Sequence, residues 1–151
     1  MYSFERAGRS QQAAVAYAYN LREQARLTPQ SSRPGNSEKS TSYIKAANAF
    51  SSCAADADEG QRRQRIVWYR NAAECFVHAG EDGKAAAAYD SAAEYTLAAG
   101  HYRKAGMFDK VVEVIQENEN KVETAVIDRL IDVASIFIPK VRDSPLFTRD
   151  D

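Results

Sequence analysis

Two cysteines and two histidines are the side chains of this chain best suited to bind a metal ion or to act as nucleophiles. Cys75 and His78 lie three residues apart, so on a helix they share one face. A structural zinc site takes four ligands, and nothing else in the chain matches a known ligand spacing. Cys75 also falls at a small apolar position of a repeated phrase. We therefore predict a packing role for Cys75, and for His78 the basic position that Arg6 and Lys104 hold in the other copies of the phrase. No metal site is predicted among these residues: Cys53, Cys75, His78 and His101.

Glycine-rich phosphate loops are the second kind of chemistry to test. The segment from Gly80 to Ala85 reads Gly-Glu-Asp-Gly-Lys-Ala, which has the wrong glycine spacing for a P-loop and no hydroxyl after the lysine to bind Mg²⁺. No dinucleotide-binding glycine pattern and no nucleophile elbow occurs in the chain. We expect a turn between helices here. The residues predict no catalytic centre and no cofactor, and the chain is not expected to be an enzyme.

A run of arginines is the best candidate for nucleic-acid binding. Arg63 and Arg70 are seven residues apart, which places them on one face of a helix. Such a face would contact phosphates. The whole chain, however, carries 20 basic and 21 acidic side chains, and a net charge of -1 gives no global attraction to nucleic acid or to an anionic membrane. We interpret the run as solvated helix surface, with nucleic-acid binding as the alternative role of Arg62, Arg63, Arg65 and Arg70.

The elements that position these residues are predicted from alanine. The chain has 26 alanines, of which 18 lie between Ala46 and Ala105. Alanine has the highest helix propensity, and no proline occurs between Pro34 and Pro139. The alternating β-branched and aromatic runs that are typical of strands are missing from the sequence. The fold class is therefore predicted to be all-α, with alanines allowing neighbouring helices to approach closely and aromatic residues, including most of the eight tyrosines, filling the core.

One short phrase occurs three times. It consists of an aromatic residue, a spacer, a basic residue or histidine, Ala-Gly, three linking positions and then a largely apolar run. We interpret the Ala-Gly as a helix end with glycine as its left-handed cap. Recurrence of a helix–turn–helix unit predicts a stack of antiparallel helical hairpins, that is, an α-solenoid. The three copies begin at Phe4, Phe76 and Tyr102.

The periodicity gives a provisional division of the chain. We predict one helical-repeat domain over residues 1–138, with a loop at 29–37, and a frayed C-terminal tail at 139–151. Residues 1–7 are interpreted as the end of an earlier helix, so we expect a fragment or arm of a larger protein. The expected helices span residues 9–28, 38–57, 60–79, 82–98, 100–105, 108–118 and 122–138.

The expected cellular location follows from the lack of membrane-spanning and signal-peptide patterns in the sequence. No apolar stretch approaches the roughly 20 residues of a membrane-spanning helix, and the first 12 residues have no signal-peptide core. Two cysteines are too few for a disulfide framework. We therefore expect a cytoplasmic or nuclear protein that does not insert into membranes.

Several phrases resemble a known family. The segments Ala-Ala-Glu-Cys-Phe-x-x-Ala-Gly at 72–80, Ala-Ala-Glu-Tyr-Thr-Leu-Ala-Ala at 92–99 and Tyr-Arg-Lys-Ala-Gly-Met-Phe-Asp-Lys-Val-Val-Glu-Val-Ile at 102–115 are similar to tetratricopeptide-type repeats. More narrowly, they resemble the helical region of fungal proteins with a UvrD-type helicase domain, and of tetratricopeptide and ankyrin repeat-containing (lupus brain antigen-like) proteins. The chain departs from the standard 34-residue repeat, since it has no Trp-x-x-Leu-Gly pattern.

The resemblance implies a non-catalytic arm, because the helicase motifs lie outside these phrases. The leading hypothesis is a protein–protein interaction scaffold that docks a protein or peptide ligand. A nucleic-acid-binding accessory segment of a helicase is the first alternative. An adaptor of membrane fusion similar to the SNAP proteins, which use comparable alanine-rich hairpins, is the second.

Overall fold

The computed structural model of the chain describes residues 2–29 and 38–118 and is entirely helical over these ranges. This confirms the predicted all-α class. The order of elements is α1 (Tyr2–Leu27), α2 (Glu38–Ala55), a 3-10 turn η1 (Glu59–Gln61), α3 (Arg62–His78), α4 (Asp82–Ser91), α5 (Tyr95–Lys104) and α6 (Phe108–Glu117). The predicted helices 38–57, 60–79 and 108–118 match α2, η1 with α3, and α6 to within a few residues.

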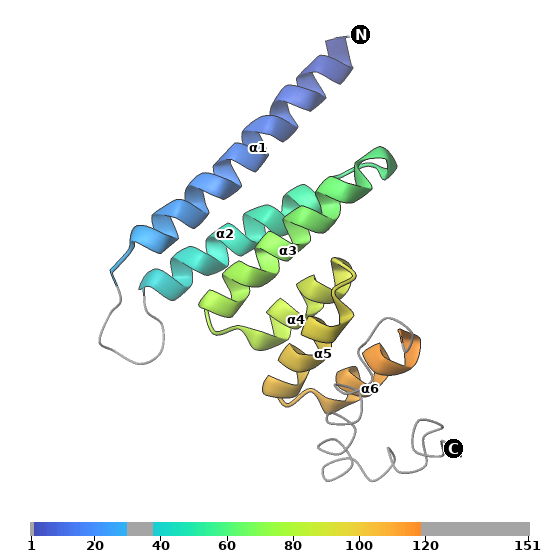
Figure 1. Cartoon of the computed structure of the whole chain (residues 1–151). Coiled ribbons are helices and arrows are strands. Elements are labelled where there is room, and N and C mark those ends of the chain that lie inside the picture. The colour runs from blue at the N-terminus through green and yellow to red at the C-terminus, as the bar shows by residue number, and fades with distance from the viewer. Residues whose placement is uncertain (1, 30–37, 119–151) are drawn as a thin grey trace.

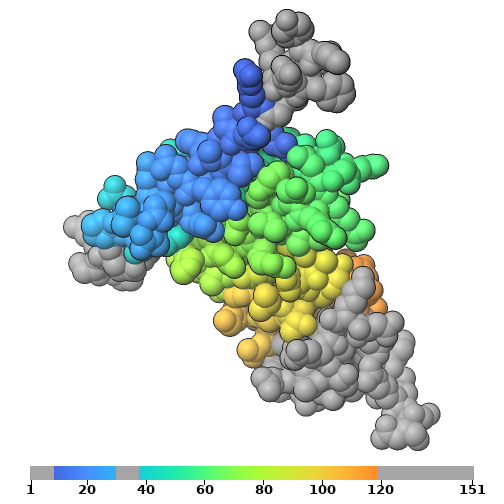
Figure 2. Space-filling model, turned by 45° about the horizontal axis from the view of Figure 1, so that its top comes forward, coloured from blue at the N-terminus to red at the C-terminus, as the bar shows by residue number. Residues whose placement is uncertain are grey.

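Each helix packs mainly against the helices that precede and follow it in the sequence. Figure 1 shows α1, α2 and α3 as long, side-by-side helices that alternate in direction, followed by the shorter α4, α5 and α6. In the space-filling view the colours follow one another in bands from α1 to α6 (Figure 2). Residues that are distant in the sequence therefore meet mostly through the helices that lie between them.

Small side chains make up most of the core. Among the described residues, the largest side chains that are fully buried are Phe50, Ile115, Val111 and Cys75, of which only Phe50 is aromatic. Alanine fills the remaining helix contacts, and Ala46, Ala47 and Ala72 have no exposed surface. Because an alanine contact lets helix backbones come close, the stack is tight although its aromatic residues are widely spaced. The one tryptophan, Trp68, is also buried.

Three equivalent turns join α3, α4, α5 and α6. In each, an N–H after the helix donates to the carbonyl oxygen of an aromatic residue five positions earlier: Glu81 to Phe76, Glu94 to Tyr89, and Met107 to Tyr102, all at 2.9 Å. The residue before each donor has a positive φ, of 80° at Gly80, 60° at Ala93 and 76° at Gly106. This is the Schellman ending of a helix, repeated every 13 residues. The glycine caps predicted at Gly80 and Gly106 are confirmed.

The middle turn corrects the predicted helices 82–98 and 100–105. The helix that begins at Asp82 ends at Ser91, and Gly100 lies inside α5 instead of between two helices. Ala93 occupies the position that glycine holds in the other two turns. A run of alanines favours an unbroken helix by propensity. The buried aromatic residues at positions 76, 89 and 102, however, repeat every 13 residues, and each is followed by a turn, so the helix ends before Ala93.

The N-terminal copy of the phrase does not end a helix. The helix α1 runs without interruption from Tyr2 to Leu27, so Gly8 lies within it and the expected helix end at Ala7 is wrong. Glycine inside a helix costs only about 1 kcal/mol, and the flanking Arg, Gln and Ala residues have high helix propensity. The helix consequently continues through Gly8.

Other predicted features lie outside the described residues. These are the helix at 122–138, the tail at 139–151 and nearly all of the loop at 29–37. Among the helices that the structure describes, none combines the length and apolar character needed to cross a bilayer.

Candidate functional site

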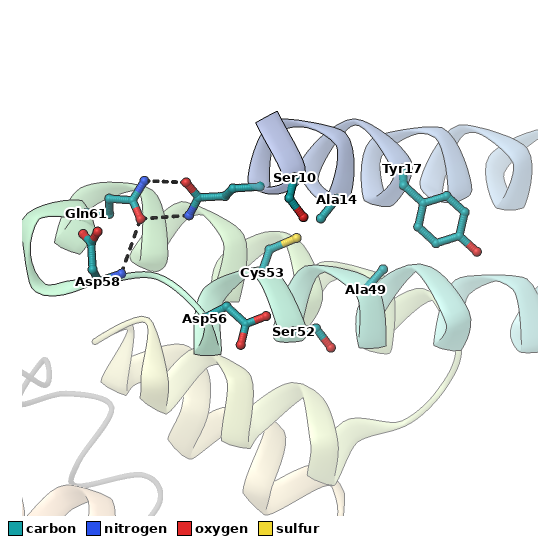
Figure 3. A pocket seen from close by; sticks show the side chains of 10 residues that line it. Ser10, Ala14, Tyr17, Ala49, Ser52, Cys53, Asp56, Asp58 and Gln61 are labelled. Carbon is teal, nitrogen blue, oxygen red and sulfur yellow. Dashed lines mark hydrogen bonds between the residues drawn. The ribbon is translucent and has the colours of Figure 1, made fainter. Parts of the chain in front are cut away.

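A groove of about 670 Å³ lies between the N-terminal half of α1, the C-terminal half of α2 and the turn that contains η1. Figure 3 shows α1 along one side and α2 along the other, with Asp58 and Gln61 at one end and Tyr17 toward the opposite end. The residues that line it come from three separate parts of the sequence: Ser10, Gln11, Ala14, Tyr17, Ala49, Ser52, Cys53, Asp56, Asp58 and Gln61.

The groove follows from the way the two helices present small side chains. On α1, Ser10, Ala14 and Tyr17 fall at i, i+4 and i+7, so they form one stripe. The facing stripe is made by Ala49, Ser52 and Cys53 of α2, and Asp56 continues it just after the helix ends. Side chains of this size do not fill the space between the helices. Consistently, residues 9–17 of α1 bury no side chain, whereas Ala18, Leu21 and Ala25 further along are buried.

Two glutamines close one end of the groove. The side-chain amide of Gln11 donates to Gln61 Oε1 at 2.8 Å, and that of Gln61 donates back to Gln11 Oε1 at 2.9 Å. The backbone N–H of Asp58 also donates to Gln61 Oε1, at 3.3 Å. The amide pair joins α1 to the turn after α2, across 50 residues of sequence, and both hydrogen bonds appear as dashed lines in Figure 3. It holds the exposed part of α1 at a set distance from α2.

An aromatic cluster holds the other half of α1 in place. The rings of Tyr19 and Phe50 meet edge to face with centroids 5.0 Å apart, and the Arg22 guanidinium lies 4.9 Å from the Tyr19 centroid. Asn71 of α3 connects to both, because its amide donates to the Tyr19 hydroxyl at 3.1 Å and its oxygen accepts from Arg22 at 3.3 Å. The wall formed by α1 is thus attached to α2 and α3 at one end and to the η1 turn at the other.

The η1 end of the groove is acidic. Asp56 and Asp58 are exposed there, and no basic residue is among those that line the groove. Asp56 follows the C-terminus of α2, whose last turn contains no basic side chain to offset the negative end of the helix dipole. Burial, reinforced by the charge of Asp56, raises the pKa of the nearby Cys53 thiol above its usual value. Within the described part of the chain neither aspartate forms an ion pair.

The structure places the four predicted arginines on α3 without bringing them together at this groove. Arg62 and Arg63 are exposed in the first turn of α3, and Arg65 is half-buried. Arg70 points to another element, since its guanidinium donates to Glu94 Oε1 at 2.6 Å. One of the four charges is therefore neutralised within the molecule.

Both cysteines are buried, whereas His78 is exposed and His101 is half-buried. Cys75 is buried, and burial raises the pKa of its thiol to about 11. The His78 ring stacks on Tyr43 with centroids 4.9 Å apart. His101 stacks on Tyr89 at 5.4 Å and its Nδ1 lies 3.0 Å from a carboxylate oxygen of Asp82. Among the described residues, no group of three or more His, Cys, Asp or Glu is arranged to hold a metal ion.

The sequence predicts that most of the tyrosines fill the core, without saying which. The structure makes the division: Tyr43, Tyr89 and Tyr102 are buried, while Tyr17 is 53% exposed and lines the groove. The other lining residues are Ser, Ala, Gln and Asp, which carry no motif. Only the i, i+4, i+7 repetition of small side chains on two helices signals their shared surface.

Comparison with known proteins gives no family for this chain. No protein-family model, no curated protein and no solved structure matches it at a significant level. The resemblance to tetratricopeptide-type repeats of helicase-linked proteins accordingly stays a prediction.

Proposed function

We propose that this chain is a non-catalytic protein–protein interaction module that docks a peptide or helix of a partner protein in the α1/α2 groove. The observation that carries the proposal is the groove itself, about 670 Å³ between two helices and lined by small side chains. A partner helix binds to such a surface by inserting its side chains between the two helices. Tyr17, half exposed at one end, is the kind of aromatic residue that concentrates binding energy at interfaces.

The way α1 is attached supports the same function. The Tyr19–Phe50 contact and the Gln11–Gln61 amide pair hold α1 at two points on either side of the groove. A groove that is already formed before binding spends little free energy on ordering, so more of the contact energy appears as affinity. The resemblance to helicase-linked repeats adds the proposal that this module is a scaffold within a larger polypeptide.

The experiment uses selection from a displayed library of helical peptides with the folded chain as bait. We expect selected peptides to lose at least about tenfold in affinity for the A14W variant, because a tryptophan at this exposed position fills the groove. A matched control is A13W, since Ala13 is also exposed on α1 but does not line the groove.

Both variants are first checked by circular dichroism, which should show unchanged helix content and melting. Equal loss of binding in A13W and A14W would contradict docking in the groove. Failure to select any peptide, with a folded bait, would contradict the interaction function itself.

A further inference from the structure

The charge of the groove is distributed unevenly along its length. Asp56 and Asp58 lie together at the η1 end, while Tyr17 lies toward the other end (Figure 3). The C-terminus of α2 adds the partial negative charge of its carbonyl groups at the acidic end. A ligand that lies along the groove therefore meets two carboxylates at one end and an aromatic side chain at the other.

The carboxylates of Asp56 and Asp58 are available to a ligand. Both aspartates are exposed, and neither forms an ion pair with any other residue that the structure describes. The amide of Gln61, the other polar group at this end, is already bonded to Gln11. The two carboxylates are thus the charged groups left to recognise a partner here.

The middle of the groove is lined by small side chains, which allow the backbone of a partner helix to come close. Its walls there are Ser10, Ala14, Ala49, Ser52 and Cys53, of which none is larger than a cysteine. Small residues on one helix allow a second helix to approach closely when it also has small side chains at the contact. The stripe from Ser10 to Tyr17 covers about two helical turns, roughly 10 Å.

We propose that the groove selects a basic helical segment of a partner protein, with lysine or arginine over Asp56 and Asp58, small side chains along the groove, and an apolar side chain against Tyr17. This inference rests on the proposed interaction function and specifies its partner. Charge complementarity favours this occupant over an acidic or uncharged helix, which would bring no cation to the two carboxylates.

The test compares the sequences and the charge dependence of peptides selected as above. We expect the selected peptides to carry lysine or arginine at one end. The double variant D56N/D58N should weaken their binding by about three- to tenfold, the range for two exposed ion pairs, with a smaller difference at 0.5 M salt. The matched control is Glu59→Gln, which removes an exposed acidic charge one residue from Asp58 that does not line the groove. It should change binding by less than about twofold.

The outcomes separate the two proposals. Acidic or neutral peptides that bind wild type and fail to bind A14W would overturn the basic-partner inference and leave groove docking intact. Basic peptides that lose affinity equally in E59Q and D56N/D58N would also overturn it, because general attraction would then explain the binding. Peptides that bind A14W as well as wild type would overturn both groove docking and the basic-partner inference.

Discussion

Ala93 adopts a backbone conformation that an L side chain disfavours, with φ of 60°. The Cβ atom makes this left-handed region cost about 1–2 kcal/mol, a cost that glycine avoids. Ala93→Gly should therefore raise the free energy of unfolding by about 0.5–1 kcal/mol after allowing for the greater entropy of unfolded glycine. Urea unfolding followed by circular dichroism measures the change.

The control uses the same substitution inside a helix. Ala87 is exposed in the middle of α4, so Ala87→Gly should lower the free energy of unfolding by about 1 kcal/mol. Opposite signs at the two positions are the expected result. Destabilisation by both substitutions would show that residue 93 does not hold a positive φ in solution.

The buried thiol of Cys75 makes stability depend on alkaline pH. Burial raises its pKa from 9.0 to about 11, so the folded protein holds this proton more firmly than the unfolded chain does. The resulting stabilisation is complete below pH 9 and is lost as the pH rises through 11, by about 2–3 kcal/mol in total. Burial also raises the pKa of Tyr89 and of Tyr102, which adds to the loss above pH 10.

Unfolding experiments at pH 8, 9, 10 and 11 test this dependence. Cys75→Ala should have lower stability at pH 8 but a shallower decline between pH 9 and 11 than the wild-type protein. Parallel declines for the two proteins would mean that the Cys75 thiol does not contribute to the pH dependence.

At the residue scale, the helix ends that could be predicted are those at which the residue type itself indicates the backbone conformation. Gly80 and Gly106 were identified because glycine is the usual residue of a left-handed cap. Ala93 was missed because alanine carries the opposite local signal, and only the 13-residue spacing of Phe76, Tyr89 and Tyr102 indicates its turn. Conversely, Gly8 was assigned to a cap although its neighbours carry the helix through it.

At the scale of elements, the Gln11–Gln61 pair is the connection that keeps the exposed half of α1 near the η1 turn. Each amide is part-buried and both partners are hydrogen-bonded, so removing one leaves the other unpaired. Replacing either glutamine by alanine should cost about 1 kcal/mol, and the double variant should cost less than the sum of the two.

A double-mutant cycle by urea unfolding measures this coupling. Gln12→Ala is the control, because Gln12 is exposed beside Gln11 and should show no coupling to Gln61→Ala. Hydrogen exchange should also be faster in the N-terminal half of α1 in both single variants. Strictly additive losses would contradict the pairing.

The groove between α1 and α2 could not be predicted from local patterns. Its walls come from residues 10–17 and 49–61, which the sequence separates by more than 30 positions. The amphipathic pattern of α2 predicts which of its faces contact other helices. It does not predict that small residues of α1 face Cys53 or that a space remains between the two helices. By contrast, Cys75 was assigned to the core correctly, because its small apolar position follows from the repeated phrase alone.

At the scale of the whole molecule, the contacts run in sequence order from α1 to α6. Among the described helices, α1 and α6 are not among the pairs that contact each other extensively. We therefore expect stability to be a sum over neighbouring helices, with distant helices coupled only through those between them. Loss of packing at one end should consequently leave the other end largely protected.

Native-state hydrogen exchange of two core variants tests this independence. Val114 is buried in α6 and Leu21 in α1. Val114→Ala should lower the local stability of α5 and α6 by about 2 kcal/mol, which corresponds to roughly 30-fold faster exchange there, with little change in α1 and α2. Leu21→Ala should give the reverse pattern. Uniform acceleration of exchange at all protected amides by either variant would show instead that helices α1 to α6 unfold as one cooperative unit. In such a unit, a ligand bound in the α1/α2 groove would stabilise α6 as much as α2.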